Sequence, residues 1–165
     1  MSLRTVRSEK SKWFPRTSDG GDGLGSDTHN KAPYRPLTND RKPVTRNMDS
    51  VARRIGPSSH GGSGEIEHFR VFEGDSFDTQ LCLVAADVIP PGSSIAEHQH
   101  IHDEELYVVL EGKGTITLDG RDEPVGPGDI ILTTMGHSHG IRNDSDQPLK
   151  ILVVEASIPT DESEE

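Results

Sequence analysis

The sequence predicts an all-β domain built of antiparallel strands, either a sandwich or a barrel. From residue 65 onward, short runs rich in Val, Ile, Leu and Thr are separated by Gly, Pro and Asp at intervals of roughly ten residues, a spacing typical of such folds. No stretch of useful length in this part has the periodicity of a helix. The expected strands are His68–Phe72, Thr79–Ile89, Ser94–His100, Glu105–Glu111, Gly114–Leu118, Asp129–Thr133, Ser138–Arg142 and Leu149–Ser157.

The residues between these runs are those that form turns. Asp119-Gly120 follows an apolar run, and it predicts a tight hairpin because both central positions of that turn need positive φ. Pro124, Pro127 and Pro148 all fall between the expected strands. A proline there removes no hydrogen bond between strands, because its missing N–H lies outside the ladder.

Residues 1–64 have a different character. They contain 12 Lys and Arg against 6 Asp and Glu, with Gly- and Ser-rich stretches at 18–23 and 58–64. The basic residues are scattered, so we expect a largely irregular, solvated segment rather than a nucleic-acid-binding arm. An alternative is that this segment lies on the acidic remainder of the chain. A short helical turn is expected around Met48–Ile55, capped by Asp49.

The charge reverses after residue 64. Residues 65–165 contain 5 Lys and Arg against 22 Asp and Glu, and the last eight residues, 158–165, form an acidic tail. Such a domain repels phosphate backbones, which makes it a poor candidate for direct nucleic-acid binding.

The sequence also bears on the compartment. The first thirty residues contain no apolar stretch suited to a signal peptide, and no stretch approaches the length of a membrane span, so we expect a cytoplasmic protein without membrane contact. The one cysteine, Cys82, cannot form an internal disulfide. Because it lies in the apolar run 81–84, we expect a small core residue in a reducing compartment.

Three histidines and a glutamate suggest a metal site. His98 and His100 lie two residues apart near the end of an expected strand, so the strand period points both imidazoles to the same face. A carboxylate after a short bend, Glu105 or Glu104, would give a mixed N/O ligand set suited to Fe, Mn, Ni, Cu, Co or Zn. A lone strand histidine is more often an ordinary half-exposed residue. The pair, with a third imidazole at His139, favours a metal.

The spacing of these residues resembles two motifs of the cupin family. The first motif is matched in full by Gly92-(x5)-His98-x-His100-(x4)-Glu105-(x6)-Gly112. The second is matched by Gly128-(x5)-Thr134-x-Gly136-(x2)-His139-(x3)-Asn143, except that the family usually has proline where this chain has Thr134. The resemblance covers about residues 65–157. It implies a double-stranded β-helix, or jelly-roll, barrel in which His98, His100, Glu105 and His139 bind one divalent transition metal and leave positions open for water or substrate.

Neighbouring residues can extend this site. His102 shares the parity of the histidine pair and is a candidate extra ligand, although Asp103-Glu104 suggests a bend before it could reach the metal. Tyr107 shares the parity of Glu105, so it should face the barrel interior. Its hydroxyl would there orient a substrate or shuttle a proton, or the ring is simply a packed aromatic.

Other polar residues nearby are expected to have structural roles. Glu104 and His137 are expected at the rim of the site, and Gly136 and Asn143 at turn and packing positions. Arg142 has the wrong parity to point inward from the strand of His139.

Three functions are compatible with such a barrel. The first is an enzyme acting on a small polar or carbonyl-bearing metabolite, with Fe(II)-dependent dioxygenase chemistry the leading prediction. The second is a non-catalytic module that binds a small molecule through the same metal. The third is a barrel braced by its ion, which open coordination positions disfavour. A homodimer is also expected, formed through an edge strand at Glu65–Phe72.

Overall fold

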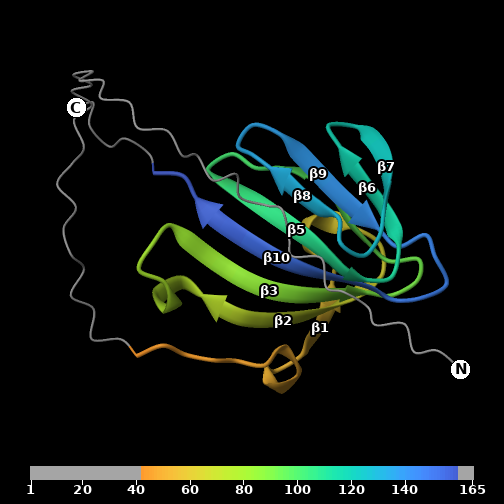
Figure 1. Ribbon diagram of the computed structural model, residues 1–165. Helices are drawn as coiled ribbons and strands as arrows, with labels where there is room; N and C mark the ends of the chain where they lie inside the picture. The colour runs from red at the N-terminus through yellow and green to blue at the C-terminus, as the bar shows by residue number, and fades with distance from the viewer. Residues whose placement is uncertain (1–41, 160–165) are drawn as a thin grey trace, which may run out of the picture. The chain divides into compact units, whose positions relative to one another are not determined.

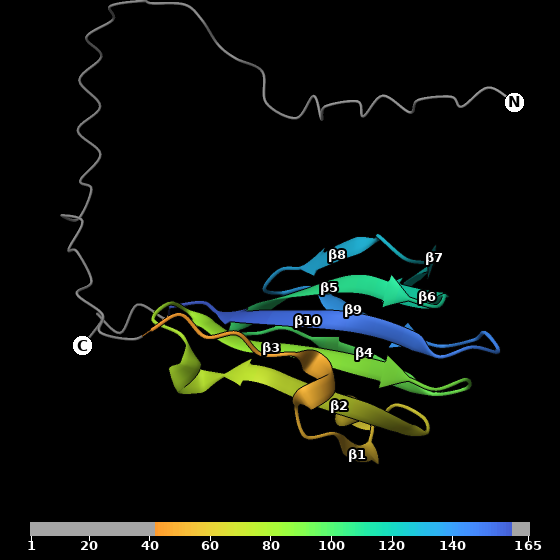
Figure 2. The same cartoon turned by 60° about the horizontal axis from the view of Figure 1, so that its bottom comes forward.

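Two antiparallel β-sheets make up the computed structural model, which describes residues 42–159 (Figure 1). Figure 2 shows the strand order of the larger sheet, from β8 to β1. In this order the six strands are β1 (Arg54–Pro57), β2 (Glu65–Glu73), β3 (Leu81–Ile89), β10 (Leu149–Ser157), β5 (Asp103–Glu111) and β8 (Ile130–Thr133). The smaller sheet contains β4 (Ser94–Gln99), β9 (Ser138–Arg142), β6 (Gly114–Leu118) and β7 (Arg121–Val125). Three short 3-10 helices complete the described chain: η1 (Met48–Ser50), η2 (Ser59–Gly61) and η3 (Gly74–Ser76). The predicted all-β class is confirmed.

The core lies between the sheets and follows from the alternation along each strand. On β5, Glu105, Tyr107 and Val109 are buried, whereas Leu106 and Val108 between them are only partly covered. Residues with the same parity on neighbouring strands share this inner face, because Tyr107 pairs with Val153 and Val153 with Ala85. One apolar cluster joins these residues to Ile116 of the smaller sheet, so the two sheets pack face to face.

Two strands were not predicted from the sequence. Both β1 and β7 are short and largely exposed, so they carry little of the apolar alternation that identifies a strand. Pro124 was expected between strands but lies within β7, opposite Thr115 of β6. It is tolerated because β7 is an edge strand of the smaller sheet, where one side of the backbone needs no partner.

The other local expectations met different outcomes. The hairpin is confirmed, since Asp119 and Gly120 have φ values of 46° and 74°. The helical turn expected over Met48–Ile55 is wrong beyond Ser50, because η1 ends there and β1 begins at Arg54. Cys82 was expected in the core but is only partly buried. Among the described residues, no helix is long and apolar enough to cross a membrane.

The edge strand expected at Glu65–Phe72 is not an edge along its first half. There β1 pairs with β2 from Glu65 to His68, and further on the Arg46 guanidinium donates a hydrogen bond to the Val71 carbonyl at 2.6 Å. The outer strands of the larger sheet are β1 and β8. The edge expected to form a dimer contact is therefore already partly paired within the chain. The homodimer itself stays a prediction, and sedimentation at micromolar concentration tests whether the protein is a dimer.

Candidate metal centre

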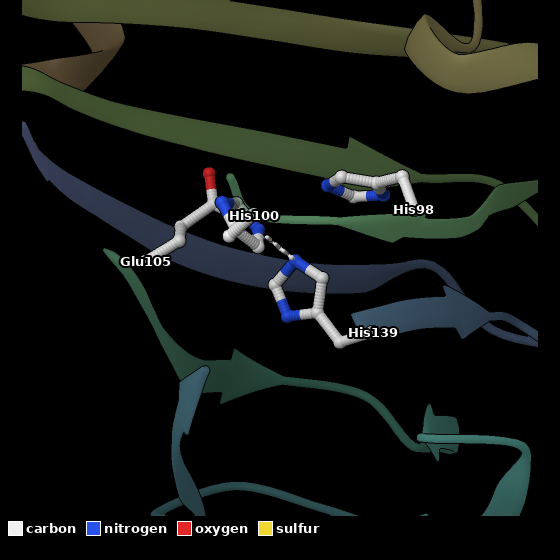
Figure 3. Close-up of side chains that lie close together, drawn as sticks. All are labelled: His98, His100, Glu105 and His139. Carbon is white, nitrogen blue, oxygen red and sulfur yellow. Dashed lines mark hydrogen bonds and ion pairs between the residues drawn. The ribbon is translucent and has the colours of Figure 1, made fainter. Parts of the chain in front are cut away.

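Four side chains from different parts of the fold meet between the sheets. His98 on β4 and His139 on β9 are directly opposite each other in the ladder, Glu105 lies on β5, and His100 follows the end of β4. One ligand atom from each lies within 4.8 Å of the others. Figure 3 shows these side chains pointing toward a common space. The fold thus gathers the four residues that the sequence motifs indicated into a group that can hold one metal ion.

Outer hydrogen bonds hold the imidazoles in one orientation. The Nδ1 atom of His98 lies 2.9 Å from the Ala96 carbonyl oxygen, and that of His100 lies 2.8 Å from an Asp103 carboxylate oxygen. Because both partners accept hydrogen bonds, the ring proton of each neutral histidine belongs on Nδ1. Each Nε2 then presents a lone pair, the form in which imidazole binds a metal.

The third imidazole is held in the same way. His139, which is fully buried, has its Nδ1 atom 2.8 Å from the Thr133 hydroxyl. Its Nε2 atom lies 3.1 Å from Nε2 of His100 (Figure 3). Two basic nitrogens aimed at each other in a buried place are poorly satisfied by hydrogen bonding alone. A cation between them would receive both lone pairs.

Glu105 completes the donor set. Its Oε2 atom lies 2.9 Å from Nε2 of His139 and 3.7 Å from Nε2 of His100. The same oxygen is buried and accepts no hydrogen bond within the described chain. An unsatisfied buried carboxylate oxygen is costly, and a bound cation would satisfy it. The donor set of three nitrogens and one carboxylate therefore fits a divalent transition metal.

The ionisation of the surrounding groups agrees with this role. Burial lowers the pKa of His98, and the nearby His60 and His139 lower it further, so this imidazole is neutral at neutral pH. Burial also raises the pKa of Tyr107 well above its usual range, as do the carboxylates of Glu105 and Asp87. The tyrosine hydroxyl is consequently a hydrogen-bond donor that keeps its proton.

Tyr107 occupies the interior position expected from its parity. Its side chain is 2% exposed, and its ring stacks on His139 with 4.5 Å between the centroids. The residue therefore packs against a candidate metal ligand and also lines the cavity beside the cluster. Both roles considered from the sequence, packing and contact with a substrate, are open to it.

A cavity of about 300 Å³ adjoins the cluster. His98, Glu105 and Tyr107 lie at one side of it, while apolar side chains of β3 and β10 line its middle. A second hollow of about 320 Å³ reaches the cluster from the side of His102 and Asp103. A volume of this order accommodates one small molecule.

The remaining candidates lie outside the cluster. His102 and Glu104 are not among the four grouped residues, although His102 lines the second hollow. His137 is exposed, and its Nδ1 atom forms a hydrogen bond with Asp119 at 2.7 Å. Arg142 points away from the interior, as its parity predicts, and pairs with Asp122 at 3.0 Å.

Asn143 and Gly136 serve structural purposes. The buried Asn143 amide donates to the carbonyls of Ile89 and Gln147, each at 2.7 Å, and so ties the end of β3 to the loop that follows β9. Gly136 adopts a φ of 90°, a conformation that side chains disfavour, and its N–H donates to the His100 carbonyl at 2.7 Å.

Three residues near the site were missed by sequence reasoning. Asp103 and Thr133 contact the candidate ligands His100 and His139, yet nothing in their spacing indicates this until the strand register is known. His60 stacks on His98 with 3.8 Å between ring centroids and 4° between planes. It belongs to a Gly- and Ser-rich stretch that was expected to be irregular, so only the fold reveals its place beside the cluster.

Comparisons with known proteins agree with this geometry. The Cupin domain family model matches residues 87–155. The chain is 33% identical over 111 residues to the Oxalate-binding protein of Thermotoga maritima, a match that covers 67% of this chain and 91% of that protein. This chain belongs to the cupin family.

Solved structures also resemble this cupin. A crystal structure of a predicted oxalate decarboxylase from Thermotoga maritima superposes with a TM-score of 0.68 at 29% identity, covering 70% of this chain and all of that one. The Quercetin 2,3-dioxygenase of Bacillus subtilis is 30% identical over 83 residues, which is 50% of this chain but only 24% of that protein. The predicted jelly-roll fold is thereby confirmed.

Proposed function

We propose that this cupin holds one divalent transition metal between His98, His100, Glu105 and His139 and acts there on a small polar or carbonyl-bearing molecule. The observation that supports this most directly is the buried Glu105 oxygen without a hydrogen bond, facing the Nε2 atoms of His100 and His139. The proposed ion is Fe(II), with Mn, Ni, Zn, Co or Cu compatible with the same donors. The proposed reaction is a dioxygenase-type oxidation.

The chemistry supplied by such an ion, when bound, is polarisation of a substrate oxygen and, for Fe(II), reaction with dioxygen. The chain's own residues supply the rest. Leu83, Ala85 and Val153 line the cavity and exclude water from the substrate. Tyr107 offers a protonated hydroxyl to a substrate oxygen beside Glu105.

A second function is favoured by one relative. The relative described as the Oxalate-binding protein of Thermotoga maritima is named for binding oxalate, not for converting it. We therefore keep as the alternative a non-catalytic module that binds a small carboxylate through the same metal. An oxygen electrode separates the two, because an enzyme of the proposed kind consumes oxygen with its substrate. A binding module only raises its melting temperature as the ligand saturates it.

Metal analysis tests the site itself. We expect about one equivalent of a transition metal per chain in the wild-type protein, as four converging donors imply. His98→Ala and His139→Ala should lose the metal while circular dichroism shows a folded barrel. His102→Ala, which removes a histidine outside the cluster, should keep it. Absence of metal from the wild-type protein, even after anaerobic reconstitution with Fe(II), Mn(II), Ni(II) and Zn(II), would contradict the proposal.

A further inference from the structure

The cavity has a second polar end, on the side opposite the four-residue cluster. Arg54 of β1 and His68 and Arg70 of β2 line it there. Strand register explains why these side chains share one face, since Arg54 pairs with His68 and His68 pairs with Asp87, another cavity residue. All three basic residues precede residue 87, where the match to the family model begins. They lie on the first two strands of the described chain.

Basic residues are rare in this part of the protein. Residues 65–165 contain only five Lys and Arg against 22 Asp and Glu. Of those five, Arg70 is the one that lines the cavity. Arg54 and Arg70 thus place two guanidinium groups at one end of a hollow in an otherwise acidic domain, where they attract an anion.

The ion pairs at this end leave positive charge available. His68 uses its Nδ1 atom to form a hydrogen bond with Asp87 at 2.9 Å, so that carboxylate already has a partner at this end of the cavity. Arg70 pairs with Glu73 at 3.0 Å, but both side chains are about half exposed, so the pair is weak and exchangeable. Arg54 forms no ion pair with any residue that the structure describes. Its guanidinium is therefore available to a ligand.

Negative groups elsewhere in the cavity do not cancel this charge. Glu105 faces the histidines of the cluster and belongs to the proposed metal site. Glu155 pairs with Glu105 in the ladder between β10 and β5, and β10 is two positions away from β2 in the sheet. The cavity thus has a metal-binding end and a cationic end, separated by apolar side chains.

We propose that Arg54, His68 and Arg70 form an anion-binding subsite that holds a second carboxylate of the ligand, remote from the group bound at the metal. This inference rests on the proposed function. The ligand class it names is the small dicarboxylates. Strands β2 and β5 are three positions apart in the sheet, or about 14 Å between backbones at the usual strand spacing. Side chains extend into the cavity from both strands and take up part of this distance. What remains suits a ligand with a few carbons between its two carboxylates.

Paired ligands test the subsite. Succinate and butyrate both have four carbons and differ by one carboxylate, so their affinities, measured by calorimetry on the metal-loaded protein, isolate its contribution. We expect succinate to bind at least about tenfold more tightly, since a hydrogen bond between charged groups contributes 1.5 kcal/mol or more. In the double variant Arg54→Gln/Arg70→Gln the two affinities should become similar, while that for butyrate stays unchanged.

A matched control comes from the adjacent arginine. Arg53 pairs with Glu67 at 3.2 Å and does not line the cavity, so Arg53→Gln removes an equal charge next to Arg54 and should keep the preference for succinate. Equal affinities in the metal-loaded wild-type protein, or a preference that survives the double variant, would overturn the subsite. Failure of the proposed function is a different result, since it shows as wild-type protein that holds no metal.

Discussion

The Nδ1 atom of His100 lies 2.8 Å from a carboxylate oxygen of Asp103, three residues further along the chain. The contact spans the bend between β4 and β5, and it turns Nε2 of His100 toward Glu105 and His139. A short local contact therefore decides which nitrogen of a candidate ligand is available.

Asp103→Asn should weaken metal binding without unfolding the protein. The amide loses the negative charge that strengthens the histidine as a donor, and loss of such an outer partner lowers metal affinity by about 10- to 100-fold. Competition with a chromophoric chelator measures this change. Asp119→Asn is the control, because Asp119 makes the same kind of contact to the exposed His137. Equal affinities in wild-type protein and Asp103→Asn would show that Asp103 does not support the site.

Tyr107→Phe separates a catalytic hydroxyl from a packed ring. The substitution keeps the stacking on His139 and removes only the donor. If the hydroxyl acts on the substrate, turnover should fall about 100-fold, the lower range for a positioned proton donor, with metal content unchanged. Because burial holds the pKa of Tyr107 well above its usual range, the wild-type rate should show no inflection from this group between pH 6 and about 9. Unchanged turnover in the variant would assign the residue to packing.

Gly140→Ala should damage both fold and site. A Cβ atom at this position would lie 2.5 Å from the backbone nitrogen of Glu97 and 2.8 Å from the carbonyl carbon of Ala96. Backbone must move to relieve this overlap, at a cost of about 1–3 kcal/mol, and the Ala96 carbonyl that orients His98 moves with it. Denaturant unfolding and metal content should both report a loss. Gly126→Ala is the control, since its Cβ would meet only a lysine side chain at 3.9 Å.

The contact between His68 and Asp87 should make stability depend on pH. The hydrogen bond to Asp87 is the main cause of a raised pKa for His68, which burial and Arg70 oppose. A raised pKa in the folded state means that protonated His68 stabilises the fold below the usual histidine pKa of about 6.5. This stabilisation is lost as pH rises through the folded-state value. His68→Gln should therefore lower the free energy of unfolding more at pH 5.5 than at pH 8.5, by denaturant titration. An equal effect at both pH values would contradict the charged pair.

Several features of this protein could be predicted from its sequence because they depend on short-range periodicity. Alternation of apolar residues identifies a strand such as β6, since side chains on a strand point to opposite faces in turn. The same period places His98 and His100 on a common face of their strand. It likewise places Tyr107 on the same face of its strand as Glu105. The hairpin at Asp119-Gly120 follows from the local need for positive φ.

Other features depended on which strands lie side by side, and no local pattern contains that information. The short strand β1 has little apolar alternation, yet its pairing with β2 brings Arg54 to the cavity. Thr133 reaches His139 only because β8 pairs with β5 in one register.

The sequence by itself determined the all-β class, the shared face of His98 and His100 and the acidic character of the domain. Tertiary structure alone decided the outer hydrogen bonds that orient the imidazoles. It also decided that Arg54, His68 and Arg70 of β1 and β2 line one end of the cavity. The reason is physical: parity follows from the geometry of a single strand, whereas these contacts join residues whose distance is set by sheet register and by the packing of one sheet on the other.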